Sequence, residues 1–270
     1  MGNTNLINVL TIACWCLGVI GLFLCAPTAF AGRPLLIDDA TPVSENNIEI
    51  EFGLFQARSH QGDREQKFPV IGVTYGVYQN LEVGLAIQRV NDDSKGSPRV
   101  MGFEDLHLTS KYKFVDETSV IPALAFSLDI KIPSANQKKG LSTGKWEEGL
   151  LLIATKSISP VVLSLNVGCL IVNRPSENTK NRILGGLSLE WPFAQNWSAV
   201  GEIFGASRKA AHEHNEAAFQ VGLRYFLTSQ IVLDAAVGRS LTSTGNAIRG
   251  TVGLTWTVDM ARILSNGASQ

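Results

Sequence analysis

The sequence predicts an all-β protein whose strands, about 12 of them, close into a single antiparallel transmembrane β-barrel after a cleaved signal peptide. Three features of the 270-residue chain lead to this prediction. Apolar residues alternate with small or charged ones at the period of two that strands impose. Short connections alternate with longer polar ones. Aromatic residues recur on the apolar face near the short connections, where a barrel meets the membrane surface.

The first 31 residues contain no Asp, Glu, Lys or Arg and include an apolar run from Val9 to Ala26. Ala29-Phe30-Ala31 has the small-x-small pattern of a signal-peptidase site, so we expect residues 1–31 to be a signal peptide cleaved before Gly32. A retained membrane anchor is the alternative, because the run is nearly long enough to span a bilayer and no basic residue precedes it. Lipidation at Cys25 is disfavoured by Leu24, which stands where a small residue is needed.

The mature chain would keep a single cysteine, Cys169, which excludes an intramolecular disulfide framework. No later apolar run approaches the roughly 18 residues of a membrane helix, so a mature protein in the membrane must cross it as a closed barrel. The net charge is −1 with both signs dispersed, and no basic stripe points to nucleic acid.

Residues 32–47 show no periodicity and contain two prolines, which predicts an extended periplasmic N-terminal segment. The barrel is predicted over residues 48–258, followed by a C-terminal tail, 259–270. Alternation is clear in most of the expected strands, but Leu150 to Ile153 are all apolar and leave the phase of the sixth strand open. The expected strands cover residues 48–57, 71–77, 81–88, 106–114, 123–132, 146–157, 163–171, 186–191, 197–203, 217–225, 231–238 and 248–258.

Connections after the even-numbered strands are short, and those after the odd-numbered strands are mostly longer and more polar. Short turns belong to the periplasmic side of such a barrel, and long loops to the outside. The longer loops are expected at residues 58–67, 91–102, 133–145, 173–180, 206–215 and 240–246. The predicted aromatic girdle at the short-turn ends consists of Tyr75, Tyr112, Trp191, Tyr225 and Trp256.

Several stretches in the expected order resemble the family named Putative MetA-pathway of phenol degradation, a group of outer-membrane transporter-like barrels. They are RPLLIDDATPV, VTYGVYQNLEVGLAI, FEDLHLTSKYKF, PALAFSLDIKIPS, LSLEWPFAQNWSAVGEIFG and VGLRYFLTSQIVLDAAVGRSLT. The resemblance implies uptake of small organic or aromatic compounds and supplies no catalytic residues. The chain departs from the pattern at its end, because about fourteen residues follow Trp256 where such barrels tend to finish on an aromatic residue. This departure bears on recognition by the outer-membrane insertion machinery.

Charged and ionisable residues recur on the face opposite the apolar one, which points into the lumen. Either these side chains pair with one another, as buried charges require, or they form a polar ring that orders ions or solutes. Arg224 is expected opposite or diagonal to Asp234, within reach of a salt bridge. The candidate lumen or pore-lining residues are Glu82, His107, Lys111, Lys113, Asp129, Lys131, Glu190, Glu202, Arg224, Asp234 and Arg249.

No cofactor, metal site or enzyme activity is expected. His212-Glu213-His214 could bind a metal, but such a loop cluster is usually solvated surface. His107, the only histidine in an expected strand, has no serine beside it in a motif typical of a barrel hydrolase.

Many of the expected inward residues are Gly, Ala, Ser or Thr, which leaves room for a narrow path. The sequence therefore predicts a passive channel for small solutes in a Gram-negative outer membrane, reached by Sec-type export, with membrane lipid, the solute and the insertion machinery as partners. A barrel with a sealed lumen is the structural alternative. Residues 32–47 enter from the periplasmic end and could plug the path. The sequence does not identify the solute, the oligomeric state or the role of the tail.

Overall fold

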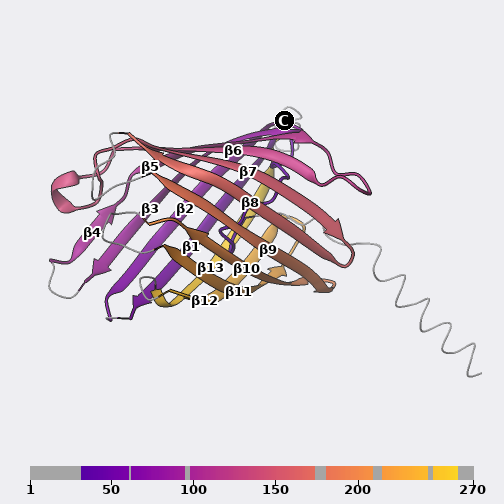
Figure 1. Cartoon of the computed structure of the whole chain (residues 1–270). Coiled ribbons are helices and arrows are strands. Elements are labelled where there is room, and N and C mark those ends of the chain that lie inside the picture. The colour runs from indigo at the N-terminus through magenta and orange to yellow at the C-terminus, as the bar shows by residue number, and fades with distance from the viewer. Residues whose placement is uncertain are drawn as a thin grey trace, which may run out of the picture.

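The strands form one closed antiparallel barrel in a computed structural model of the chain. The structure describes residues 32–60, 62–94, 98–173, 181–208, 215–242 and 246–260. The strands pair with their neighbours in chain order, except that β3 pairs with β5 as well as with the short strand β4, and the pairings β1–β13 and β2–β3 close the sheet. Figure 1 shows the tilted strands wrapped around a common axis. Among the described residues, each long strand therefore pairs on both sides, as a lipid environment requires.

Twelve long strands build the barrel, and one short strand, β4, extends it at one end. Both β4 and β5 pair with the same side of β3, at residues 89–92 and 81–86 respectively. The strands are β1 Asn47–Ser59, β2 Arg64–Tyr78, β3 Leu81–Asp93, β4 Val100–Phe103, β5 Leu106–Val115, β6 Ala123–Ile132, β7 Glu147–Ile158, β8 Val161–Val172, β9 Arg182–Ala194, β10 Trp197–Ala206, β11 Glu216–Phe226, β12 Ile231–Ser240 and β13 Asn246–Asp259.

The predicted division between an apolar outer face and a polar inner face is confirmed. On β8, for example, Leu165 and Val167 are exposed at 47% and 52%, whereas Ser164 and Asn166 keep 4% and 2% of their surface. The large apolar side chains lie on the outside because lipid, not protein, covers that face.

The phase of β7 is decided by the barrel. Leu152 is 51% exposed on the outer face, and Ile153 is fully buried inside. Ile153 packs there with Ala40, Ala123 and Ala125, and Leu151 lies against this cluster. The inner face is therefore more apolar here than the small-residue pattern of the other strands predicted.

Two predicted loops are wrong in part. The strands β1 and β2 pair as far as Arg58 and Arg64, so only residues 60–63 connect them. The connection predicted at 91–102 is interrupted because β3 continues to Asp93 and β4 begins at Val100. The sequence showed no alternation at these strand ends, because a strand that extends beyond the membrane can carry polar side chains on both faces. The connection between β9 and β10 is also shorter than predicted, residues 195–196.

The predicted aromatic girdle is present at the short-turn end. Tyr75, Tyr112, Trp191 and Trp256 are exposed on the outer face at 38–48%, and the Tyr225 ring lies 4.6 Å from that of Trp197. Amphipathic aromatic side chains favour the membrane surface, so the girdle marks the membrane interface at the short-turn end. None of the described residues belongs to a helix that could cross a membrane.

Candidate functional site

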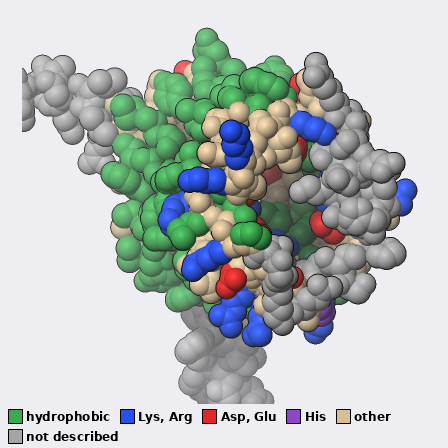
Figure 2. Space-filling model, turned by 90° about the vertical axis from the view of Figure 1, so that its left-hand side faces the viewer, with side chains coloured by type: hydrophobic (Ala, Val, Ile, Leu, Met, Phe, Trp, Pro, Cys, Tyr) green, Lys and Arg blue, Asp and Glu red, His purple; other side chains and the backbone are tan. Residues whose placement is uncertain are grey.

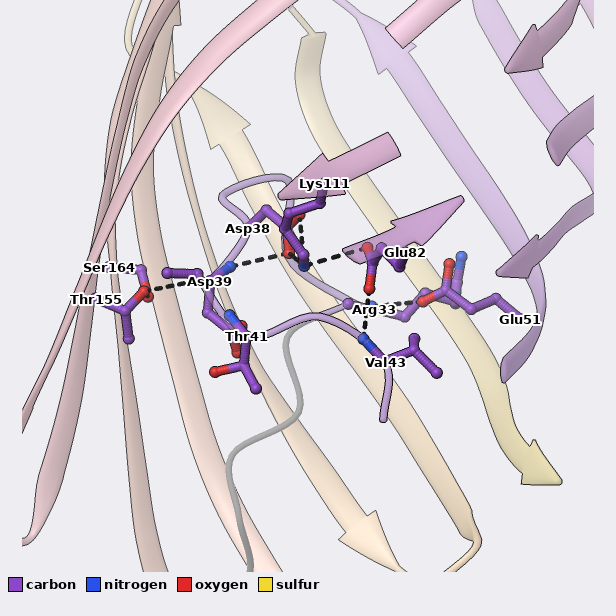
Figure 3. Close-up of polar contacts among 12 residues, drawn as sticks. Arg33, Asp38, Asp39, Thr41, Val43, Glu51, Glu82, Lys111, Thr155 and Ser164 are labelled. Atoms are coloured by element: carbon purple, nitrogen blue, oxygen red, sulfur yellow. Dashed lines mark hydrogen bonds and ion pairs between the residues drawn. The ribbon is translucent and has the colours of Figure 1, made fainter. Parts of the chain in front are cut away.

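Residues 32–46, which we call the plug, fill the half of the lumen that lies toward the short turns. This segment forms one isolated bridge, Glu45 to Gly76, and otherwise contacts the wall through side chains and backbone groups. Its partners lie on strands around most of the barrel, from β1 to β13. Figure 3 shows the plug crossing the lumen among polar side chains of the wall.

Acceptors on the wall bind the backbone amides of the plug. The Glu202 carboxylate accepts hydrogen bonds from the amides of Leu36 and Ile37, at 2.9 and 2.8 Å. The hydroxyl of Thr155 accepts from the Ala40 amide at 2.9 Å, and Glu82 accepts from the Val43 amide at 2.5 Å. Because an irregular segment has few partners of its own, these wall groups satisfy amides that would otherwise be buried without hydrogen bonds.

Ion pairs fix the plug at two further places. Lys111 lies 3.1 Å from the Asp38 carboxylate and 3.4 Å from that of Glu82 (Figure 3). Arg33 lies 3.4 Å from Asp234, and it donates to the hydroxyl of Thr251 at 2.6 Å. Charges removed from water are tolerated only when they are paired in this way.

Facing glycines make room for Arg33. Gly53 and Gly253 are register partners on β1 and β13. A Cβ atom added to Gly53 would lie 2.2 Å from the Arg33 guanidinium, and one added to Gly253 would lie 2.1 Å from its Nε. Any side chain at these positions would therefore displace Arg33 from the wall.

The predicted salt bridge between Arg224 and Asp234 is wrong, although the two residues are register partners. Arg224 pairs with Glu190 at 2.5 Å and donates to the carbonyl oxygens of Gly32 and Arg33 at 2.8 and 2.9 Å. Asp234 pairs instead with Arg33. The plug therefore provides the cation that pairs with Asp234 and the carbonyl oxygens that accept hydrogen bonds from Arg224.

The remaining candidate residues also point inward, nearer the two ends of the barrel. His107 binds Asp129 at 2.8 Å, Lys131 pairs with Glu147, and Lys113 lies 2.7 Å from Asp116. Arg249 is the exception, because it forms no ion pair or hydrogen bond among the described residues and lies over the rings of Phe55 and Phe204.

Several important residues escaped the sequence prediction. Arg33 and Asp38 belong to a segment without periodicity, so nothing in the pattern assigned them to the lumen. The alternation of β1 does place Glu49 and Glu51 on the inward face, although neither is among the candidate pore-lining residues. The large inward side chains of Phe55 and Phe204 also follow the alternation of their strands.

A partly open cavity of about 420 Å³, which we call the vestibule, lies on the side of the plug that faces the long connections. Leu36 and Ile37 of the plug line it, together with residues of β7 to β13. Leu36 remains 57% exposed although it lies within the lumen. Figure 2 views the end of the barrel that carries the long connections and shows a hollow with Lys and Arg side chains around it.

No group of three potential metal ligands occurs among the described residues. The loop cluster expected to be solvated surface lies outside the described residues, so that expectation stays a prediction for His212, Glu213 and His214.

Residues 31–258 match the family described as Putative MetA-pathway of phenol degradation. The fold is similar to the COG4313 outer membrane channel from Pseudomonas putida F1, with a TM-score of 0.62, 14% identity and coverage of 82% of this chain and 98% of that chain. It is also similar to the KdgM porin, with a TM-score of 0.52, 8% identity and coverage of 77% and 98%. The NanC porin gives the same TM-score and coverage at 9% identity. Comparison with curated proteins gives no match.

Proposed function

Because the chain belongs to the family Putative MetA-pathway of phenol degradation, we propose that it is a passive channel for small organic solutes, held closed by its plug. The protein is a β-barrel of the outer-membrane type, with lipid around its apolar face. Similar folds include a protein described as an outer membrane channel and others described as porins. Aromatic solutes are the group that the family name favours.

The observation that carries the proposal is the vestibule, which ends on a plug held by exchangeable polar contacts. The amides of Leu36 and Ile37 and the side chains of Arg33 and Asp38 bind wall groups that water could replace. The net free energy of each contact is much smaller than its strength in isolation, because water offers the same hydrogen bonds to both partners after release. A segment held in this way can leave the lumen without unpairing any barrel strand.

Conductance in planar bilayers tests the proposal. We expect the mature protein to show rare openings and a version lacking residues 32–44 to conduct steadily. Lys131→Glu should shift the ion selectivity of that open form toward cations, because Lys131 lies in the lumen outside the plug. Silence in both proteins, with a folded barrel shown by heat-modifiable gel mobility, would overturn the channel and favour a structural barrel with a sealed lumen.

A non-enzymatic role is part of this proposal. His107 and Asp129 form the orienting half of a hydrolytic triad, but the described residues place no Ser, Thr or Cys in hydrogen-bond contact with His107. A triad requires such a nucleophile beside the imidazole. Ester hydrolysis that is abolished by His107→Gln would contradict the proposal.

We also propose that residues 1–31 are removed on export and that the tail, 259–270, influences recognition by the insertion machinery. N-terminal sequencing of the protein from outer membranes should give Gly32, and retention of Met1 would show that the leader stays as an anchor. A chain ending at Val258, close to Trp256, should insert at least as fast as the full chain if the tail hinders recognition.

A further inference from the structure

Arg249 is a lumen cation whose hydrogen-bonding groups have no protein partner within the described part of the chain. It projects inward from β13 beside two small register partners, Ala57 and Gly238. Its guanidinium carbon lies 4.9 Å from the centroid of the Phe204 ring and 5.5 Å from that of Phe55. The rings attract the cation, but they accept no directional hydrogen bonds in its plane. Among the described residues, its Nε is buried without an acceptor.

The carboxylates nearest to Arg249 are engaged with other groups. Glu202 accepts the amides of the plug, Glu65 pairs with Lys67 at 3.4 Å, and Glu216 pairs with Arg182 at 2.8 Å. None of the three lies within 4 Å of the Arg249 nitrogens, so their attraction is only long-range. The guanidinium edge therefore remains available to an acceptor that enters from outside.

The surroundings of Arg249 are apolar on several sides. Arg249 lines the vestibule together with Phe204, Leu151, Leu184 and Leu36. The volume of about 420 Å³ falls in the range, roughly 300–1,000 Å³, of cavities that bind small molecules. Arg182 and Glu216 also line the vestibule, but they pair with each other at 2.8 Å. Among the described residues, Arg249 is the lining cation without a protein acceptor, and such a cavity selects a ligand that has an apolar body and one anionic group.

We propose that the vestibule binds small monocarboxylates with a compact apolar body, and that Arg249 holds the carboxylate by a bidentate hydrogen bond. The planar guanidinium matches the geometry of a carboxylate, and the interaction is stronger in a cavity from which water is partly excluded. Leu36 and Leu151 would contact the apolar body. This proposal rests on the channel function, since the vestibule is the outer half of the same lumen, and it names the class of solute.

Calorimetry on the mature protein in detergent tests the site, with benzoate, benzyl alcohol and acetate as probes. We expect benzoate to bind more tightly than either of the others, because only benzoate carries both a carboxylate and an apolar ring. Arg249→Gln should weaken benzoate binding about tenfold or more, the usual effect of losing a hydrogen bond to a charged group, and leave benzyl alcohol unaffected. Equal affinity of the variant and the unaltered protein for benzoate would overturn the proposal, as would acetate binding as tightly as benzoate.

Arg239→Gln is the matched control, because Arg239 lies near the same end of β12 but on the outer face, in register with Phe219. It removes the same charge and should not change benzoate binding. Arg249→Lys keeps the charge without the planar fork and should bind benzoate with intermediate affinity, which covers the case in which Arg249→Gln does not fold. If benzoate binds in a manner that depends on Arg249 but the barrel carries no current, the channel function is refuted and the binding site stands. If the barrel carries current but does not bind benzoate, the binding site is refuted and the channel function stands.

Discussion

Arg33 Nε lies 3.4 Å from a carboxylate oxygen of Asp234, which ties the N-terminal segment to strand β12. The two residues are about two hundred positions apart in the sequence, and Asp234 lies directly beside Arg224 on the adjacent strand. Arg224 is drawn to Glu190 instead, so the plug completes the charge pairing of the wall. The charges of the plug and of the wall therefore neutralise one another, and removing a charge from either one should weaken the binding of the plug to the wall.

The position of Gly76 gives a direct test of plug seating. A Cβ atom added there would lie 2.1 Å from the carbonyl oxygen of Ser44 and 2.4 Å from that of Val43. Gly76→Ala should therefore displace the plug from β2 and leave the barrel closed. Hydrogen exchange should become faster at the amides of the plug, including Val43, and the conductance should rise.

Gly201→Ala is the control for Gly76→Ala. A Cβ atom at Gly201 would meet its nearest neighbour, Val221 Cγ1, at an ordinary 3.7 Å. We expect no change in plug exchange for this variant. Unchanged exchange in Gly76→Ala would mean that the plug does not rest against β2 in the membrane.

Two adjacent leucines test the phase of β7. Leu152 faces lipid and Leu151 lines the vestibule. Leu152→Arg should lower the free energy of unfolding by roughly 2–4 kcal/mol, because a charge near the bilayer midplane is unfavourable. Leu151→Arg points its charge into the vestibule, where water and polar lining groups such as Asn166 and Glu216 can solvate it, and should cost much less. Urea unfolding in liposomes measures both values, and equal losses would contradict the assigned phase.

Arg224 and Glu190 form a buried ion pair, with 3% and 8% of their side chains exposed. Arg224→Met should destabilise the barrel by about 3–5 kcal/mol, because it leaves the Glu190 carboxylate buried without a partner. The double variant Arg224→Met with Glu190→Met should recover much of that loss. A double variant less stable than the single one, measured by the same unfolding experiment, would show that the carbonyl contacts of Arg224 with the plug matter more than the ion pair.

Glu117 lies in the turn between β5 and β6, outside the membrane, and its contribution to the stability of the fold should depend on pH. Burial alone would raise the pKa of its carboxyl, but hydrogen bonds from Lys156 and Ser157 outweigh burial and lower the pKa. A lowered folded-state pKa means that the carboxylate stabilises the fold above its unfolded pKa, about 4.3, and that this contribution is lost as the pH falls through the folded value.

Glu117→Gln should therefore cost up to about 1 kcal/mol at neutral pH and little in strong acid, since surface pairs contribute in that range. Unfolding of the variant and the unaltered protein at both pH values gives the difference. A cost that does not change with pH would assign the effect to packing instead of charge.

The family resemblance and the alternation of the strands can both be recognised in the sequence, and the comparisons and the structure confirm them. The barrel fold could be predicted because lipid accepts only apolar side chains, so the strands carry apolar residues at alternate positions. The same constraint predicts from alternation alone that Lys111, Glu190, Glu202 and Arg224 lie on the inner face, where all four are buried.

Outside β7, the sequence by itself determined which strand residues face lipid and which face the lumen, because that choice depends only on the strand period and the solvent on each side. It did not determine the partners within the lumen, since a closed barrel brings together residues from distant strands and allows several pairings. Only the tertiary structure decided that Arg224 binds Glu190 and that Asp234 binds Arg33. It also decided that Ile153 faces inward and Leu152 outward. Residues 150–153 are all apolar and show no alternation, so only the register with β6 and β8 determines which side chains face the lumen.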